Sequence, residues 1–206
     1  MPDVPDRRPV LDKFPEVQAV EADLITYEAL LRRWQARINL VGPSTLPDLW
    51  RRHFADSIQL LSYASQASTW IDLGSGAGFP GMVIALALKG RADSIVHLVE
   101  SDTRKAAFLR EVSRETQARA IIHAARIEEV APTLPQPDVV TSRALAPLPT
   151  LVALTRPWLL KGATGLFLVG QSQKAELTAL DDDPTLRVAR SPSRTSDGLV
   201  VSVSCS

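Results

Sequence analysis

Residues 71–81 read IDLGSGAGFPG, a short apolar run followed by a loop with glycines at 74, 76, 78 and 81. Glycine lets a loop adopt positive φ and lets its backbone approach a ligand closely. Two kinds of nucleotide site begin in this way. The spacing Gly76-x-Gly78-x-x-Gly81 fits the dinucleotide fingerprint, whereas Asp72-x-Gly74-x-Gly76-x-Gly78 opens many sites for a methyl donor. A plain strand-to-helix turn is the third interpretation, and four glycines in eight residues count against it.

Around this loop, short apolar runs alternate with helical stretches. The predicted strands are 69–73, 95–99, 120–123, 137–141 and 163–169, and the predicted helices between them are 80–89, 103–117, 126–131, 147–158 and 172–180. Strands separated by helical crossovers predict an α/β fold with a parallel, doubly wound sheet. Runs at 186–191 and 198–204 are joined by a polar turn alone, which predicts a terminal antiparallel hairpin. A seven-stranded, mostly parallel sheet ending in a hairpin favours a Rossmann-like methyltransferase fold over a dinucleotide dehydrogenase.

The residues before the sheet have helical periodicity. Apolar positions recurring at threes and fours predict a helix over 16–40, and Gly42 and Pro43 then end it. A second helix is predicted to run to about residue 65, with Ser44 or Thr45 as its cap. The Pro-rich residues 1–15 are expected to be a loosely ordered lead-in without the features of a signal peptide. We therefore expect three parts, a lead-in (1–15), a helical extension (16–66) and a Rossmann-like domain (67–206).

Composition excludes several classes of function. The chain has 206 residues with 23 basic and 23 acidic side chains, so any surface for nucleic acid must be local. The lone Cys205 gives no disulfide framework, as expected for a reducing cytoplasm. Three scattered histidines and one cysteine provide no metal-ligand spacing. No apolar run approaches the ~20 residues of a membrane span. We expect a cytoplasmic protein without a metal or a membrane partner.

Two charged residues follow predicted strands. Glu100 lies 24 positions after Gly76, where an acidic side chain can accept hydrogen bonds from ribose hydroxyls in a dinucleotide or a methyl-donor site alike. Arg143 follows the fourth strand, where its side chain would enter the cleft and suit a phosphate or a guanine edge. The alternatives are a surface glutamate and an exposed loop arginine. Ser101 or Thr103 is expected to cap the next helix.

Five segments taken together resemble one bacterial family. They are RRHFADSIQL (51–60), DLGSGAGFPG (72–81), HLVESDTRKAAFL (97–109), ARIEEV (125–130) and DVVTSRALAPLPTL (138–151). Over about residues 28–176 the chain is similar to the small-subunit (16S) ribosomal RNA guanine-N7 methyltransferases, called RsmG or GidB. The resemblance implies a cytoplasmic, S-adenosyl-L-methionine-dependent enzyme that methylates N7 of one guanine in 16S ribosomal RNA, free or within the small ribosomal subunit.

The resemblance also implies roles for individual residues. It places the donor site at Asp72, Gly74, Ser75, Gly76, Gly78, Phe79, Glu100, Ser101, Ala125, Arg126, Ile127, Glu128 and Arg143. His53 and Asp56 would brace the N-terminal helices against the donor loop. The chain departs from the family at Val169-Gly170, where the family usually reads Lys-Gly, and Lys174 is a possible substitute.

RNA binding requires a basic surface in spite of the zero net charge. Residues 28–56 contain three acidic residues against five arginines, which are the candidate RNA contacts Arg32, Arg33, Arg37, Arg51 and Arg52. Ordinary solvated helix faces are the alternative interpretation. Trp34 and Trp50 lie in apolar stripes and are predicted to be core residues. The sequence does not determine the oligomeric state, and a monomer is the expectation.

Guanine N7 carries an in-plane lone pair and no proton, so its methylation requires no general base. The guanine gains a positive charge on methylation, which an arginine at N7 would oppose. Arg143 is therefore expected to position the acceptor through O6 or a phosphate. Two other functions stay open at this stage. A nicotinamide oxidoreductase would rest on the glycine spacing and Glu100, and a donor-binding ribosome-assembly factor with weak or no catalysis would be favoured by Val169.

Overall fold

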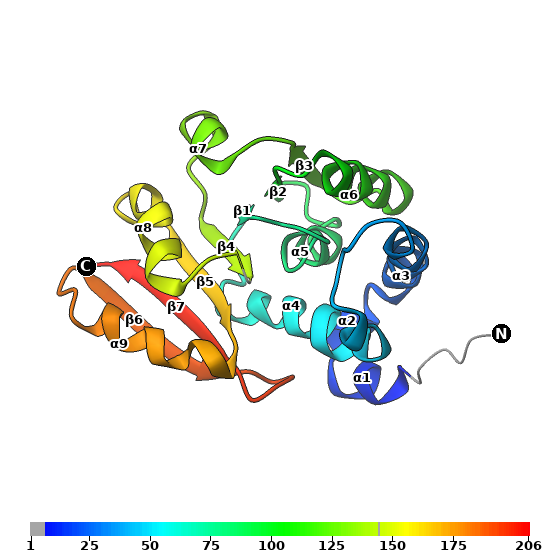
Figure 1. The fold of residues 1–206 in the computed structure, drawn as a ribbon, viewed down its shortest axis with the longest axis horizontal. Helices are drawn as coiled ribbons and strands as arrows, with labels where there is room; N and C mark the ends of the chain where they lie inside the picture. The colour runs from blue at the N-terminus through cyan, green and yellow to red at the C-terminus, as the bar shows by residue number, and fades with distance from the viewer. Residues whose placement is uncertain (1–6, 144) are drawn as a thin grey trace.

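A computed structural model describes residues 7–143 and 145–206 of the chain, except for the side chains of 172–174. Its centre is one seven-stranded sheet in the order β3-β2-β1-β4-β5-β7-β6 (Figure 1). The strands are β1 (Thr69–Leu73), β2 (Ile95–Val99), β3 (Ala120–His123), β4 (Val139–Arg143), β5 (Thr164–Val169), β6 (Leu186–Pro192) and β7 (Leu199–Cys205). Strands β1 to β5 are parallel, and β7 is antiparallel to both β5 and β6. The predicted fold class is confirmed.

The first three strands have the predicted bounds, but β4 is displaced by two residues. It was expected over 137–141 and spans Val139–Arg143. Arg143 pairs with Leu168 of β5, so it is the last residue of the strand and not part of the following loop. A residue held in a sheet ladder has little freedom of backbone direction, and the Arg143 side chain is therefore presented by a rigid element.

Side chains alternate between the two faces of the sheet, as the pleat requires. Trp70 and Leu98 face a core formed with the N-terminal helices, α5 (Gly81–Ala87) and α6 (Thr103–Thr116). Ile71 and Val140 face the opposite side, which is covered by α7 (Ile127–Val130) and α8 (Leu148–Leu159). Helical segments η5 (Gln171–Leu177) and α9 (Thr178–Asp181) extend that second layer over the hairpin. Both faces are buried, which explains the continuous apolar runs in the central strands.

The N-terminal extension is more irregular than the two predicted helices. The first helix divides into α2 (Pro15–Gln18) and α3 (Glu21–Gln35). It ends at residue 35 rather than 40, because the Gln35 side chain accepts hydrogen bonds from the backbone of Leu40 and Val41 and holds a turn there. The second helix is a series of short segments, η1 (Pro43–Asp48), η2 (Trp50–Ala55), α4 (Asp56–Ile58) and η3 (Gln59–Tyr63). Pro47 inside η1 lacks the N–H that a regular helix needs.

The lead-in differs from its expected loose order. Residues 1–6 lie outside the described part of the chain, but Arg8–Lys13 form helix α1. Phe14 is only 1% exposed and belongs to the main core. Burial of one aromatic side chain supplies a favourable free energy that offsets part of the cost of ordering a short segment.

The cap of α6 also differs from the prediction. Neither Ser101 nor Thr103 caps the helix. The Asp102 carboxylate does so, accepting hydrogen bonds from the backbone N–H of Arg104 (2.8 Å) and Lys105 (3.3 Å). These bonds also lower the pKa of Asp102.

Candidate active site

A cavity of about 580 Å³ opens at the carboxyl ends of β1, β2 and β4. This is where the strand order reverses, between β1 and β4, and open α/β sheets bind ligands at such a point. The volume is in the range of ligand sites. Most of the predicted donor-site residues line it, namely Gly74, Ser75, Gly76, Phe79, Glu100, Ser101, Ala125, Arg126, Ile127, Glu128 and Arg143. The fold therefore brings together segments that lie as much as 69 positions apart in the chain.

The absence of a side chain serves a different purpose at each of two cavity-wall glycines, Gly74 and Gly76. Both have positive φ, +66° at Gly74 and +56° at Gly76. A Cβ on Gly74 would lie 2.6 Å from the Leu145 side chain, so this glycine makes room for a neighbour. A Cβ on Gly76 would meet nothing closer than 3.8 Å. The empty space beside Gly76 is therefore available to a ligand.

Asp72 and Gly78 do not line the cavity, in contrast to the roles implied for them. A Cβ on Gly78 would clash with the Tyr27 hydroxyl and with Met82, so this glycine allows a helix of the extension to pack under the loop. Asp72 is fully buried beneath the loop. Its carboxylate accepts hydrogen bonds from the Thr141 hydroxyl (2.9 Å) and the Gly81 N–H (3.2 Å). Both residues shape the loop from below.

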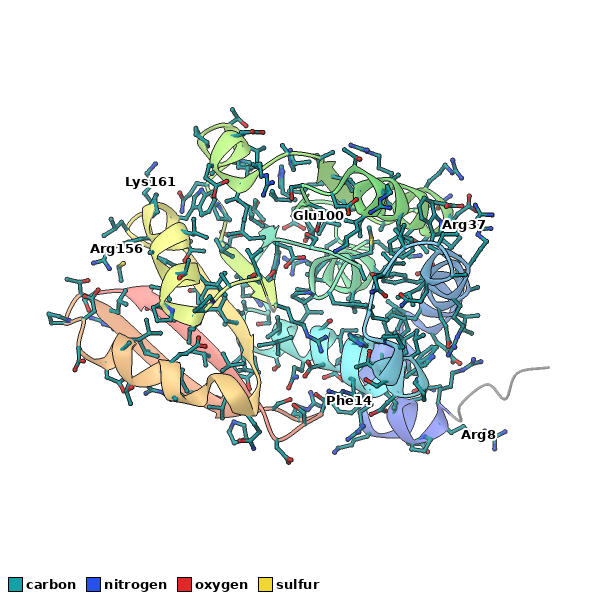
Figure 2. The ribbon with its side chains drawn as sticks, in the orientation of Figure 1. Arg8, Phe14, Arg37, Glu100, Arg156 and Lys161 are labelled. Atoms are coloured by element: carbon teal, nitrogen blue, oxygen red, sulfur yellow. The ribbon has the colours of Figure 1, made fainter. Side chains whose placement is uncertain are left out.

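Glu100 connects the loop to β2. One carboxylate oxygen accepts a hydrogen bond from the Gly76 N–H, and the other accepts one from the Asp102 N–H, each at 2.7 Å. Figure 2 shows Glu100 near the centre of the molecule. Each carboxylate oxygen has two lone pairs, so the side chain can also accept a hydrogen bond from a ribose hydroxyl. Glu100 thus orders the loop before any ligand is present.

Tyr27 of α3 is the residue of the loop environment that sequence reasoning missed. Its hydroxyl donates a hydrogen bond to the carbonyl of Ala77, and its ring stacks on Phe79 with centroids 5.5 Å apart. Burial raises the pKa of Tyr27 well above its ordinary value, and the nearby charge of Asp72 adds to this effect. In the sequence Tyr27 is one of several apolar positions of a helix, and no local signal distinguishes it.

We predict that Tyr27→Phe weakens donor binding while the fold persists. The ring packing is retained, but the buried Ala77 carbonyl loses its donor, which costs about 1–3 kcal/mol. The loop then has more freedom, so the Kd for S-adenosylmethionine should rise several-fold by calorimetry, with the thermal unfolding temperature lowered by a few degrees. Tyr63→Phe, at an exposed position, is the matched control. An unchanged Kd would show that the hydroxyl does not order the loop.

Burial raises the pKa of Asp72 to about 6, although hydrogen bonds from Ser75, Thr141 and Gly81 oppose the shift. The native carboxyl therefore keeps its proton at pH values where the unfolded chain has released it. Between the unfolded value of 3.8 and about 6 the native state binds more protons, so this group's contribution to stability falls as pH rises through that window.

Asp72→Asn should remove this pH dependence. We expect the free energy of unfolding of the native protein, relative to that of the variant, to fall by about 2 kcal/mol between pH 4 and pH 6.5. Urea denaturation at several pH values measures it. A pH-independent difference between the two proteins would contradict a raised pKa at Asp72.

Arg143, His53 and Asp56 form a buried group at one end of the cavity. Arg143 Nη1 lies 3.0 Å from His53 Nδ1, and Arg143 Nη2 lies 3.7 Å from Asp56 Oδ2. Burial, then the charges of Arg143 and Arg52, lower the pKa of His53 to about 3. His53 is thus neutral near pH 7, and because arginine has only donors, Nδ1 must accept the hydrogen bond. The other ring nitrogen donates to the Thr45 hydroxyl, at 3.0 Å.

The resemblance implies that His53 and Asp56 brace the N-terminal helices against the donor loop. In the structure these two residues interact with different segments. The His53 ring lies 4.7 Å from the Phe79 ring, centroid to centroid, and so contacts the donor loop. Among the described residues, no hydrogen bond or ion pair joins Asp56 to that loop. It accepts hydrogen bonds from Thr195 and Ser193 in the turn between β6 and β7, which the sequence did not indicate.

Four of the five candidate RNA contacts line two separate cavities, and Arg32 lines neither of them. Arg33 of α3 and Arg37, just beyond the end of that helix, surround a hollow of about 320 Å³ together with Arg104. Figure 2 shows Arg37 at the outer side of α3, away from the hairpin. Arg51 and Arg52 of η2 line a different cavity beside Arg143. Three of the five are ion-paired, in the pairs Arg32–Glu28, Arg33–Glu111 and Arg51–Asp48.

Trp34 and Trp50 contribute to the core, as predicted. Trp50 is 4% exposed and donates its indole N–H to Glu28 at 2.7 Å. Trp34 is partly buried and donates to Glu111 at 2.6 Å. Val169 is also a packing residue, because it lies 4% exposed in an apolar cluster with Phe167 and Leu177. The side chain of Lys174 lies outside the described part of the structure.

The cavity wall includes residues that were not predicted. Lys105 comes from α6, and the apolar residues are Leu40, Val41, Ala77, Val99, Leu145, Ala146 and Leu154. Apolar wall residues have no distinctive pattern in a sequence. Lys105 lies five positions after Glu100, at the start of a helix. This closeness to Glu100 in the sequence was the one signal that could have placed it at the cavity.

A family model described as rRNA small subunit methyltransferase G (GidB) matches residues 20–196. The chain belongs to this family. It is 52% identical over 191 residues to "Ribosomal RNA small subunit methyltransferase G" of Methylobacterium sp. (strain 4-46), covering 92% of this chain and 90% of the relative. A relative of the same name from Bradyrhizobium sp. (strain ORS 278) is 46% identical over 205 residues, covering 97% and 91%. Family membership makes the chain a methyltransferase, which confirms the predicted enzyme class.

Solved structures agree on the fold. A methyltransferase from Geobacter sulfurreducens has a TM-score of 0.62 at 13% identity, covering 89% of this chain and 90% of its own. The O-methyltransferase TomG from Streptomyces achromogenes, in complex with SAM, has a TM-score of 0.60 at 16% identity, with the same coverages. At these identities the likeness shows the Rossmann-like methyltransferase fold alone.

Residues 7–143 and 145–206 contain neither a candidate membrane span nor a candidate metal site. None of their helices combines the length and the apolar character that crossing a membrane requires. They contain no group of three or more histidine, cysteine or acidic side chains arranged to hold a metal ion.

Proposed function

We propose that this protein uses S-adenosyl-L-methionine to methylate N7 of a specific guanine in small-subunit (16S) ribosomal RNA, acting in the cytoplasm. The observation that carries the proposal is the open space beside Gly76, within a cavity walled by Glu100 and the Ala125–Glu128 turn, in a chain of this family. Free 16S ribosomal RNA and the small ribosomal subunit are the two candidate substrates.

The residues present fit this donor. Its extended body needs a groove with a close backbone approach, which the Gly74–Gly76 loop provides. Glu100 can accept hydrogen bonds from both ribose hydroxyls, and the Ala125–Glu128 turn can flank the adenine. S-adenosyl-L-methionine supplies a methyl group on a positively charged sulfonium sulfur, and a neutral thioether is left after transfer.

The protein's part in the reaction is alignment and exclusion of water. Because guanine N7 has a free lone pair, no side chain has to remove a proton. His53 agrees with this, since a pKa of about 3 and a hydrogen bond from Arg143 leave it no role as a base. Arg143, held by His53 and Asp56 at the cavity wall, would bind O6 or a phosphate of the acceptor. Orientation of this kind accounts for a large share of many enzymatic rates.

RNA binding would use the arginines of the N-terminal helices. Arg37 and Arg52 are the two of the five that form no ion pair among the described residues, so they are the freest to bind phosphate. Arg32, Arg33 and Arg51 would exchange a carboxylate partner for phosphate on binding. Unstacked bases in a loop are the form in which RNA presents its base edges to proteins. We retain the expectation of a monomer.

The other two functions have lost their support. The oxidoreductase rested on the glycine spacing and Glu100, and membership of a methyltransferase family counts against it. The assembly factor rested on Val169, and the similarity to relatives named as methyltransferases favours an active enzyme instead.

The test is transfer of a labelled methyl group from S-adenosylmethionine to small ribosomal subunits and to naked 16S RNA, both from a strain that lacks this modification. N7-methylguanine is then located by borohydride and aniline cleavage. We expect cleavage at a single guanine. Label in another nucleotide, or no label with either substrate, would refute the proposal.

A further inference from the structure

A second cavity, of about 540 Å³, lies beside the candidate active site. Arg143 lines both cavities and so stands in the wall between them. The second cavity is built from η2, the end of β5 and the turn over residues 193–198 between β6 and β7. Figure 1 shows that this turn extends from the hairpin towards the N-terminal helices. No function assigned so far requires the turn to be there.

The walls of this second cavity are held in place by hydrogen bonds. Asp56 accepts a hydrogen bond from the Thr195 hydroxyl at 2.5 Å. Gln59 accepts one from the Arg194 N–H at 2.9 Å, and Arg51 donates to the Thr195 carbonyl at 3.3 Å. The Arg194 guanidinium also lies 4.8 Å from the centroid of the Phe14 ring. The hairpin turn is thus anchored to the extension, and the cavity is preformed.

Three guanidinium groups converge on this cavity, and only two of them are balanced. Arg51 is paired with Asp48, and the charge of Asp197 on the cavity wall also acts on it. Arg143 has Asp56. The Arg52 side chain forms no hydrogen bond or ion pair among the described residues.

The positive charge of Arg52 disfavours the protonated, positively charged forms of Arg143 and His53. Burial lowers the pKa of Arg143, Asp56 raises it, and Arg52 lowers it further. After burial and Arg143, Arg52 also lowers the pKa of His53. Asp48, Asp56 and Asp197 match the three arginines in number, but they act on Arg51 and Arg143. A bound anion would give Arg52 the direct partner that it lacks.

We propose that this second cavity binds a phosphodiester group of the substrate RNA adjoining the target nucleotide, with Arg52 as the principal cationic contact and the Ser196 hydroxyl as a further donor. The proposal rests on the proposed function, because the target base must reach the donor cavity on the other side of Arg143. A phosphodiester matches the site because guanidinium forks and hydroxyls both donate to its oxygens. The hairpin turn is then part of the acceptor site.

The test compares Arg52→Gln with Lys161→Gln, which removes one charge at an exposed site after α8, in the turn leading to the amino end of β5 (Figure 2). We expect Arg52→Gln to raise the KM for small ribosomal subunits about tenfold, with the Kd for S-adenosylhomocysteine unchanged. The slope of log affinity for RNA against log salt should fall by about one. Arg52→Lys should recover part of the affinity, and Lys161→Gln should match the native protein.

Several results would overturn the proposal. One is an unchanged KM and salt slope in Arg52→Gln. Another is a loss of S-adenosylhomocysteine binding, which would mean that Arg52 acts through the donor site. A third is tight binding of inorganic phosphate to the native protein, abolished by Arg52→Gln, with RNA affinity unaffected; the cavity would then hold a free phosphate. Failure of the proposed function is distinguishable, since the native protein itself would then methylate no RNA.

Discussion

Gly76→Val is expected to abolish measurable binding of S-adenosylmethionine. The Cβ of residue 76 would point into open space, with the nearest heavy atom 3.8 Å away, so the folded protein has room for the side chain but the ligand does not. The positive φ of +56° adds backbone strain, because a β-branched residue strongly disfavours that region. Titration calorimetry should show no heat at donor concentrations a hundredfold above the native Kd.

The control for strain is Gly162→Val. Gly162 also has a positive φ, +96°, and a Cβ there would meet no atom within 4 Å, but it lies in the turn after α8. This variant should lose about 1–3 kcal/mol of stability and bind the donor normally. Normal donor binding by a folded Gly76→Val protein would remove the loop from the donor site.

Arg143→Ala is expected to lower kcat for RNA methylation by about a hundredfold or more, with donor affinity largely retained. The guanidinium lies at the end of the cavity and contacts protein groups from the extension, whereas the donor loop is ordered independently by Glu100 and Tyr27. Displacement of the acceptor by about 1 Å is enough to lower the rate by this amount. Single-turnover methylation and calorimetry measure the two quantities.

Removing Arg143 also leaves Asp56 without its cation, so the effect on folding needs a control. Asp56 keeps hydrogen bonds from Gln59, Thr195 and Ser193, and the variant should therefore fold with reduced stability. Arg143→Lys retains the charge but not the two-pronged geometry and should recover only part of the rate. Full activity of Arg143→Ala would exclude a role in acceptor positioning.

The sequence by itself determined the sheet and most of the cavity wall. Strand period, the glycine loop and the residues just after each strand are local signals, and in a parallel sheet the carboxyl ends of the strands meet at one edge. These signals place Gly76 and Glu100 together, whereas the role of the 125–128 turn follows from the family resemblance. The hairpin was also predicted locally, since its two apolar runs are joined by a polar turn without a helix.

Only the tertiary structure decided which parts of the N-terminal extension and the hairpin belong to the site. Tyr27 reaches Ala77 across 50 positions, His53 reaches Arg143 across 90, and Asp56 reaches Thr195 across 139. Such contacts depend on how whole elements pack, and packing leaves no period or spacing in the chain. The same reason explains Gly78 and Asp72, which belong to the loop motif but lie beneath it because α3 packs from below. The physical chemistry of this site therefore combines a local motif with contacts that only the folded chain creates.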